Sequence, residues 1–323
     1  MDTLSLALWA ANLELPALSL KAWVDWIDGR MGELRKSGCR LLVLPEFACG
    51  QWLSFAPPHL PVNKQVAWLA EIATESQGLL SPLAEKHDMA LLAGTMPFTL
   101  PSGRYTNRAW LFLPDGRKFA QDKLCLTPSE QNPQGWLLEP GSEIRIIPWE
   151  GLRLAIAICL DIEFTALWRR LGKLDLDLVL VPAKTDKISG YNRVFACAYA
   201  RAIELQTVVC VVGAVGNPYG NPVYDTGLGG ASVYAPPDES INPTGIIAAL
   251  EPHAAVSGAS PLLFVPNVPV GGVRLTRHGA AEAEVWPSSW SAKHVRILGP
   301  ARPDASPVAA RARSAPPPGA AEG

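Results

Sequence analysis

Short apolar runs of strand length alternate with longer amphipathic segments along most of this 323-residue chain. The runs are rich in Leu, Val, Ile and Ala, and the segments between them show the three-to-four-residue spacing of a helix with one apolar face. Because a sheet must bury its faces, this alternation is typical of helices layered on sheets, the α/β class. The chain is long enough to bury a sizeable core, as one large domain or as two.

Local signals place the expected strands and helices. Ser19 is the N-cap of a first helix closed by Gly38, and Pro114-Asp115-Gly116 forms the turn of a β-hairpin. We predict strands at residues 4–9, 41–44, 89–94, 152–158, 178–181, 207–212, 231–234, 246–250, 262–265 and 273–275. We predict helices at residues 19–37, 63–88 (one helix, or two around Gly78), 164–171 and 191–205.

The sequence changes character toward its end. After about residue 250 the helix and strand periods weaken, and from residue 299 Pro, Ala, Arg and Ser predominate. We assign residues 1–298 to one domain, with 251–298 as an atypical C-terminal extension of it. Residues 299–323 contain too few apolar side chains to offset the entropy of ordering, which predicts a disordered tail.

Charge and cysteine content narrow the functional classes. The formal net charge is −2 and the basic residues are dispersed, which argues against a nucleic-acid or anionic-lipid surface and favours a small-molecule substrate. The six cysteines form no C-x-x-C pair, so we expect a reducing compartment without zinc or disulfides. No apolar run reaches the roughly 20 residues of a membrane span, and Asp2 replaces the basic start of a signal peptide. A cytoplasmic protein is expected.

Three chemically complementary side chains follow predicted strands. Glu46 follows the strand at 41–44, Lys123 follows the second arm of the hairpin, and Cys159 follows the strand at 152–158. Strand ends within a sheet converge on one crevice, so we expect these side chains to meet. A thiol attacks only as its thiolate and therefore needs a neighbouring base or cation. The set predicts a cysteine nucleophile with its own acid–base group.

This set suits attack on a carbon–nitrogen centre. Cys159 is the candidate nucleophile, and Lys123 and the backbone N–H of Leu160 can stabilise the oxyanion that forms on an amide carbonyl. Glu46 can take the thiol proton, return it to the departing amine and then activate water against the thioester. The cycle requires neither a metal nor an organic cofactor.

The motifs around these residues resemble those of the nitrilase superfamily, the carbon–nitrogen hydrolases with a Glu-Lys-Cys triad. The resemblance extends from the first strand to about Leu250. The motifs are Leu-Pro-Glu at 44–46, Asp-Lys-Leu at 122–124 with Glu130 seven positions after the lysine, Ile-Cys-Leu-Asp-Ile-Glu-Phe at 158–164 and Arg-Ala-Ile-Glu at 201–204.

The resemblance implies a fold and an activity. It implies a four-layer αββα sandwich that dimerises to αββα-αββα, so a homodimer or higher homo-oligomer is expected. It also implies hydrolysis of a non-peptide carbon–nitrogen bond, for which a linear amide giving a carboxylate plus ammonia or an amine is our leading interpretation. Glu130 is implied as an accessory carboxylate that positions Lys123 or the substrate.

Two departures from the family pattern keep alternatives open. Leu160 stands where the family commonly has an aromatic residue, and Glu163 stands where it has an arginine, which alters the charge near the thiol. One alternative is a catalytically silent homodimer with a binding or regulatory role. Others are hydrolysis of a nitrile or N-carbamoyl compound, acyl transfer to an amine, and a Cys–His protease dyad built on Cys159.

Overall fold

The computed structural model describes residues 1–218, 227–254, 258–280 and 291–296. The chain divides into a compact unit, Met1–Ser289, and a second unit, Trp290–Gly323. In the second unit the structure describes one short 3-10 helix, Ala292–His294. The predicted tail at 299–323 lies outside the described residues.

The first unit contains two six-stranded sheets of mixed direction. In the first sheet the strand order is β12-β1-β2-β3-β4-β5, with β1, β2 and β3 parallel and the remaining pairs antiparallel. Its strands are β1 (Leu4–Trp9), β2 (Leu41–Val43), β3 (Ala90–Thr99), β4 (Tyr105–Phe112), β5 (Lys118–Asp122) and β12 (Leu262–Val268). The predicted hairpin is the β4–β5 pair.

The second sheet repeats this plan. Its order is β11-β10-β9-β8-β7-β6, with β7, β8 and β9 parallel and the outer pairs antiparallel. Its strands are β6 (Ile147–Trp149), β7 (Leu152–Ile156), β8 (Leu178–Ala183), β9 (Val208–Gly213), β10 (Leu228–Tyr234) and β11 (Ile246–Ala254).

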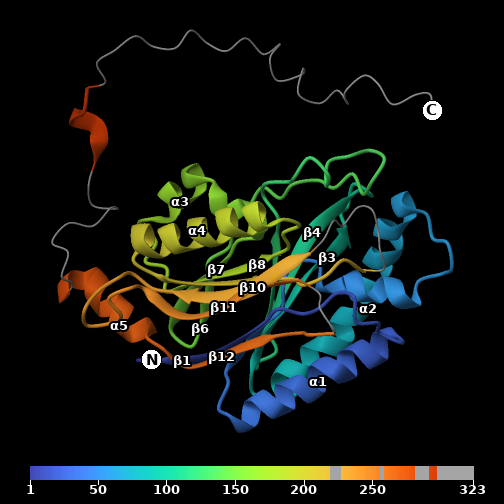
Figure 1. Ribbon diagram of the computed structural model, residues 1–323, viewed down its shortest axis with the longest axis horizontal. Helices are drawn as coiled ribbons and strands as arrows, with labels where there is room; N and C mark the ends of the chain where they lie inside the picture. The colour runs from blue at the N-terminus through green and yellow to red at the C-terminus, as the bar shows by residue number, and fades with distance from the viewer. Residues whose placement is uncertain (219–226, 255–257, 281–290, 297–323) are drawn as a thin grey trace. The chain divides into compact units, whose positions relative to one another are not determined.

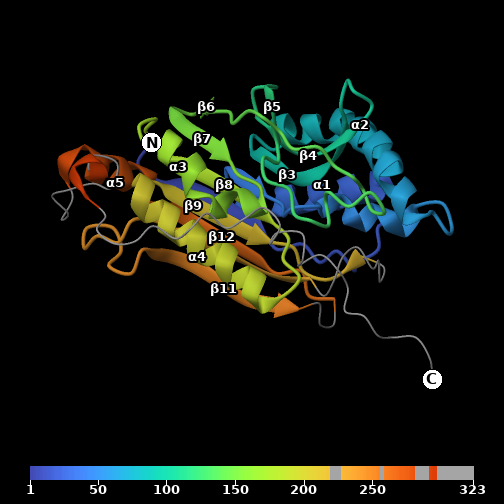
Figure 2. The same ribbon diagram turned by 90° about the horizontal axis from the view of Figure 1, so that it is seen from above.

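Helices cover the outer faces of the two sheets, as Figures 1 and 2 show. Helices α1 (Leu20–Lys36) and α2 (Val62–Lys86) lie on the first sheet, and α3 (Thr165–Leu171) and α4 (Ile188–Leu205) on the second. The Ser19 hydroxyl accepts a hydrogen bond from the Ala22 N–H at 3.1 Å, which confirms the predicted N-cap. The layers confirm an α/β sandwich.

Strand alternation divides the apolar side chains between two cores. Along β1, Leu6 and Leu8 belong to the core between the sheets, whereas Ala7 and Trp9 belong to the core under α1 and α2. Trp9 also packs edge-on against Trp26 of α1, with ring centroids 4.3 Å apart. A fully buried leucine such as Leu6 or Leu8 contributes about 1.5–3 kcal/mol to the free energy of unfolding. The cores hold the sheets in fixed register beneath the loops that follow the strands.

The predicted strand at 273–275 is wrong, because this segment belongs to helix α5 (Val270–Leu275). Val270 and Val273 are its buried residues, and a spacing of three suits one face of a helix and not one face of a strand. The preceding strand was placed correctly but is longer than predicted. As β12 it pairs with β1, so this part of the chain completes an edge of the first sheet.

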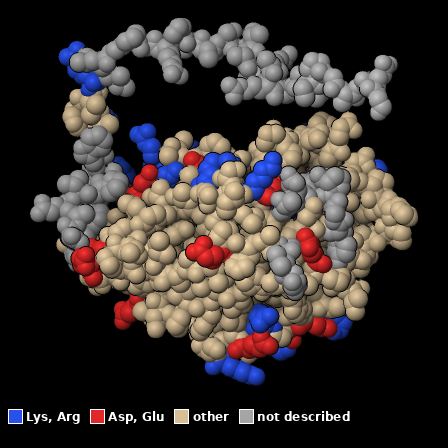
Figure 3. All heavy atoms as spheres, in the orientation of Figure 1, with Lys and Arg blue, Asp and Glu red and all other residues tan. Residues whose placement is uncertain are grey.

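The surface shows no large patch of one charge on the face drawn in Figure 3, where Lys and Arg lie apart and are interspersed with Asp and Glu. Within the described residues, no helix is both long enough and apolar enough to cross a bilayer.

Candidate active site

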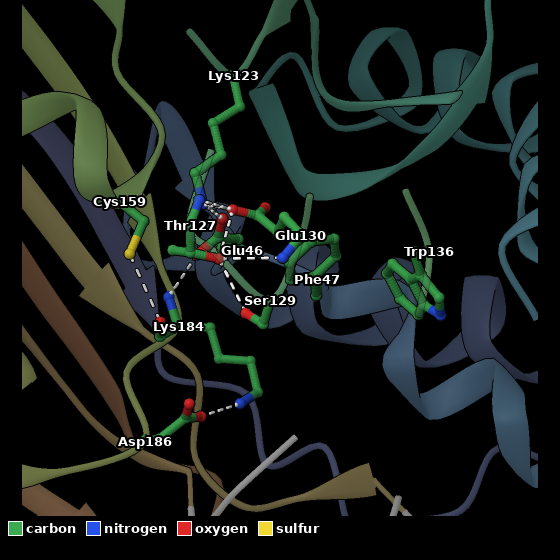
Figure 4. Close-up of a pocket in the computed structure, with 10 residues that line it drawn as sticks. All are labelled: Glu46, Phe47, Lys123, Thr127, Ser129, Glu130, Trp136, Cys159, Lys184 and Asp186. Carbon is green, nitrogen blue, oxygen red and sulfur yellow. Dashed lines mark hydrogen bonds and ion pairs between the residues drawn. The ribbon is translucent and has the colours of Figure 1, made fainter. Parts of the chain in front are cut away.

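The three predicted side chains line one cavity at the ends of their strands (Figure 4). Glu46 lies shortly after β2, Lys123 directly after β5, and Cys159 begins a 3-10 helix (Cys159–Glu163) after β7. Cys159 has φ = 48°, a left-handed conformation that is uncommon for a residue other than glycine. This sharp turn between strand and helix presents the thiol at the end of the sheet.

The cavity is half open and encloses about 520 Å³, including the part that opens to solvent. It combines ionisable groups with two aromatic rings, Phe47 and Trp136, which meet edge to face with centroids 5.3 Å apart. Its lining residues are Glu46, Phe47, Lys123, Thr127, Ser129, Glu130, Trp136, Cys159, Lys184 and Asp186. Charged side chains on one wall and aromatic rings on another suit a small polar substrate.

Lys123 is buried between two carboxylates. Its Nζ lies 2.7 Å from Glu46 Oε1 and 2.8 Å from Glu130 Oε2, and its side chain is 1 % exposed. The two negative charges raise the pKa of Lys123 well above its ordinary value, although burial opposes them. Lys123 is therefore an ammonium, held in place as a fixed positive charge. Glu130 is further anchored by the Thr127 N–H, at 2.8 Å.

Glu46 accepts hydrogen bonds at both of its oxygens. Oε1 accepts from Lys123 and from Asn107 Nδ2 at 2.9 Å, while Oε2 accepts from the backbone N–H of Lys184, also at 2.9 Å. Burial and the charge of Glu130 raise the pKa of Glu46, and Lys123 opposes this shift. Because three donors face it, Glu46 is a carboxylate at neutral pH with a greater proton affinity than a solvated glutamate.

Cys159 rests as a neutral thiol. Burial and the neighbouring charge of Glu46 raise its pKa well above the ordinary value, and Lys123 only partly opposes them. Its Sγ donates to the carbonyl oxygen of Lys184 at 3.5 Å. The peptide groups of Lys184 therefore contact both thiol and carboxylate. A resting thiol beside a carboxylate of raised pKa is suited to proton transfer during attack.

The turn that carries Cys159 also contains the two departures noted in the sequence. Leu160 lies in the first turn of the 3-10 helix, where backbone N–H groups have no intrahelical acceptor. Glu163 pairs with Arg193 of α4 at 2.6 Å and does not line the cavity. The negative charge at 163 is thus paired with a cation outside the cavity lining.

Sequence reasoning missed Asn107, which contacts both Glu46 and Glu130. A signal was available, because Asp115 lies midway between Asn107 and Lys123 and a hairpin centred on it pairs them. The structure shows this pairing as a hydrogen bond from the backbone N–H of Lys123 to the backbone carbonyl of Asn107 at 2.9 Å. Lys184 and Trp136 also lie in the wall of the cavity.

Comparison with known proteins assigns the family. The sequence model described as Carbon-nitrogen hydrolase matches residues 6–253, from the first strand to β11. The chain belongs to the carbon–nitrogen hydrolase family. Membership of the nitrilase superfamily, inferred from the motifs, is confirmed.

Individual relatives are moderately similar. The "Probable hydrolase YhcX" of Bacillus subtilis (strain 168) is 30 % identical over 211 residues, covering 65 % of this chain and 40 % of that protein. An "(R)-stereoselective amidase" of Pseudomonas sp. is 31 % identical over 156 residues, covering 46 % and 54 %. The chain thus spans about half the length of these curated relatives.

A solved structure shares the fold of this carbon–nitrogen hydrolase. The amidase from Nesterenkonia sp. AN1 aligns with a TM-score of 0.63 and 20 % identity, over 86 % of this chain and 97 % of that one. In that protein a mutant shows covalent addition of the acetamide moiety of fluoroacetamide at the active-site cysteine.

Proposed function

We propose that this carbon–nitrogen hydrolase is an amidase that cleaves a linear amide through a thioester on Cys159. The observation that carries the proposal is the buried Glu130–Lys123–Glu46 chain of ion pairs, which lines the same cavity as the thiol. The names of the relatives favour an amide over a nitrile or an N-carbamoyl compound, since two of the proteins compared above are amidases.

In the first half of the reaction Glu46 accepts the thiol proton as Sγ attacks the amide carbonyl carbon. The carbonyl π electrons move to the oxygen, and Lys123 Nζ with the Leu160 N–H stabilises the resulting oxyanion. Lys123 is suited to this role because the carboxylates that hold it keep it charged and leave it little freedom to reorganise.

In the second half the tetrahedral intermediate collapses and the carbon–nitrogen bond breaks. The leaving nitrogen takes the proton from Glu46 and departs as ammonia or an amine, leaving a thioester. Glu46, again a carboxylate, removes a proton from water as it attacks the thioester carbonyl. The carbon–sulfur bond then breaks, the sulfur recovers a proton from Glu46, and the carboxylic acid leaves.

The test is a panel of short linear amides, nitriles and N-carbamoyl compounds, with ammonia release and the intact mass of the protein as readouts. We expect ammonia from at least one amide, an acyl adduct mapped to Cys159, and neither with Cys159→Ala. Cys125→Ala is the matched control, because Cys125 is partly exposed and lies outside the cavity lining. Turnover of nitriles alone, or full activity in Cys159→Ala, would contradict the proposal.

A further inference from the structure

We propose that Asn107 is a positioning residue for this reaction, whose amide holds the Glu46 carboxylate in the orientation that faces Cys159. The inference rests on the proposed function. Asn107 lies on β4, is fully buried and is not part of the cavity lining. It therefore acts through Glu46 and does not touch the substrate.

The amide of Asn107 contacts both carboxylates of the cluster. Its Nδ2 donates to Glu46 Oε1 at 2.9 Å and to Glu130 Oε1 at 3.2 Å. Ionised carboxylates only accept hydrogen bonds, so the nitrogen and not the oxygen of the amide must face them. The backbone carbonyl of Asn107 also accepts the backbone N–H of Lys123 at 2.9 Å. One residue therefore contacts all three members of the ion-paired cluster.

An uncharged donor suits this position. Glu46 and Glu130 share a single ammonium, so the cluster carries an excess negative charge in a buried place. The Asn107 amide adds donors between the carboxylates without adding charge. Its own Oδ1 is buried and has no hydrogen-bond partner among the described residues, an arrangement that native proteins rarely keep. The side chain is therefore positioned by the hydrogen bonds that its nitrogen donates to the carboxylates, and not by any hydrogen bond to its oxygen.

The consequence for Glu46 is a fixed division of roles between its oxygens. Oε1 accepts from Lys123 and Asn107, whereas Oε2 has one donor among the described residues, the N–H of Lys184. The backbone carbonyl of Lys184 accepts from the Cys159 thiol. The remaining acceptor capacity is thus on the oxygen that Lys184 contacts, and Lys184 is the residue that also contacts the thiol. Without the Asn107 donor the carboxylate gains rotational freedom and becomes easier to protonate.

The other charged groups that face Glu46 come from three segments. Lys123 follows β5, Glu130 lies in the loop beyond it, and Cys159 lies after β7. The ammonium of Lys184 pairs with Asp186 at 2.7 Å. Asn107→Ala alters none of these charges, so a change in the titration of Glu46 in this variant reports the lost donor.

The test follows alkylation of Cys159 by iodoacetamide between pH 4 and 9, read by intact mass and peptide mapping, which requires no knowledge of the substrate. We expect Asn107→Ala and Asn107→Leu to react about tenfold more slowly, the effect of one hydrogen bond to a charged group. The acid limb, which is the fall in rate at low pH, should lie at higher pH than in the wild type. Thr106→Val is the matched control. Thr106 is the buried neighbour on β4 and its hydroxyl has no partner among the described residues, so we expect wild-type reactivity.

A folded Asn107→Ala or Asn107→Leu protein with the wild-type rate and acid limb would overturn the inference. Asn107→Leu fills the same space without adding a charge or a donor, so it decides the matter if circular dichroism shows that Asn107→Ala is unfolded. Glu46→Gln separates this inference from the function on which it rests. If Glu46→Gln loses the acid limb but the Asn107 variants show it at the wild-type pH, the inference alone fails. If Glu46→Gln matches the wild type, Glu46 is not the base and both fail.

Discussion

The carboxylate of Asp161 accepts the backbone N–H of Cys125 at 2.7 Å, which ties the turn after β7 to the loop after β5. The same carboxylate also accepts the N–H groups of Leu124, at 3.1 Å, and Ile158, at 3.0 Å. One side chain thus fixes the residues that flank both Lys123 and Cys159. These hydrogen bonds join the loop next to Lys123 to the turn that carries Cys159.

Replacement of Asp161 by Asn should loosen this link. The amide nitrogen would face an N–H donor, so we expect about 2–4 kcal/mol of lost unfolding free energy, measured by urea denaturation, together with slower alkylation of Cys159. Asp25→Asn is the control, because Asp25 forms an exposed pair with Lys21 and should cost under about 1 kcal/mol. Equal stability of the two variants would argue against the role of Asp161.

Loss of the Lys123 ammonium should destabilise the fold, because it leaves two buried carboxylates unpaired. Lys123→Met leaves Glu46 and Glu130 without a cation in a buried place, so we expect about 3–5 kcal/mol of destabilisation in urea. Adding Glu130→Gln should recover part of that stability, since it removes one of the repelling charges, but should restore no activity. Lys21→Met on the surface is the control, with an expected change under about 1 kcal/mol. A double variant no more stable than Lys123→Met would count against this explanation.

Gly94 allows β3 to pass close to the turn that carries Glu46. It has φ = +71°, and a Cβ added there would lie 2.2 Å from the carbonyl oxygen of Pro45. Gly103 is a matched control with φ = +78° and nothing within 4 Å of the same atom.

We expect Gly103→Ala to lose about 1 kcal/mol from its positive φ alone, and Gly94→Ala to lose several kcal/mol and to be nearly inactive. Urea denaturation and ammonia release measure the two effects. Similar losses in both variants would show that the close approach at Gly94 is unimportant.

The dependence of activity on pH should be one-sided. Glu46 must be ionised to act as the base, and its pKa is raised by burial and by Glu130, so kcat/KM should rise with pH through a pKa above 4.5. The pKa values of Cys159 and Lys123 are both raised well above their ordinary values, so neither group should produce a decline up to about pH 9. A profile that instead rises near pH 8.5, the ordinary thiol pKa, would indicate a preformed thiolate and contradict proton transfer to Glu46.

The α/β class followed from local patterns. The capped first helix, the hairpin turn at 114–116 and the alternation of strand and helix periods are short-range properties, so the sequence alone predicted them. The segment at 273–275 was misread because two apolar residues on either side of one polar residue, Val-Arg-Leu, match the alternation of a short strand. Only burial of Val270 and Val273 on one face resolved it as a helix.

The convergence of Glu46, Lys123 and Cys159 on one cavity was likewise predictable, because each follows a strand. Their environment was not. The peptide groups of Lys184 that bridge thiol and carboxylate, and the amide of Asn107 behind Glu46, belong to segments far apart in the sequence. Local sequence determined which reactive groups this chain possesses. Tertiary structure decided their charge states and orientations, because those depend on burial and on donors that only the packing of two sheets brings together.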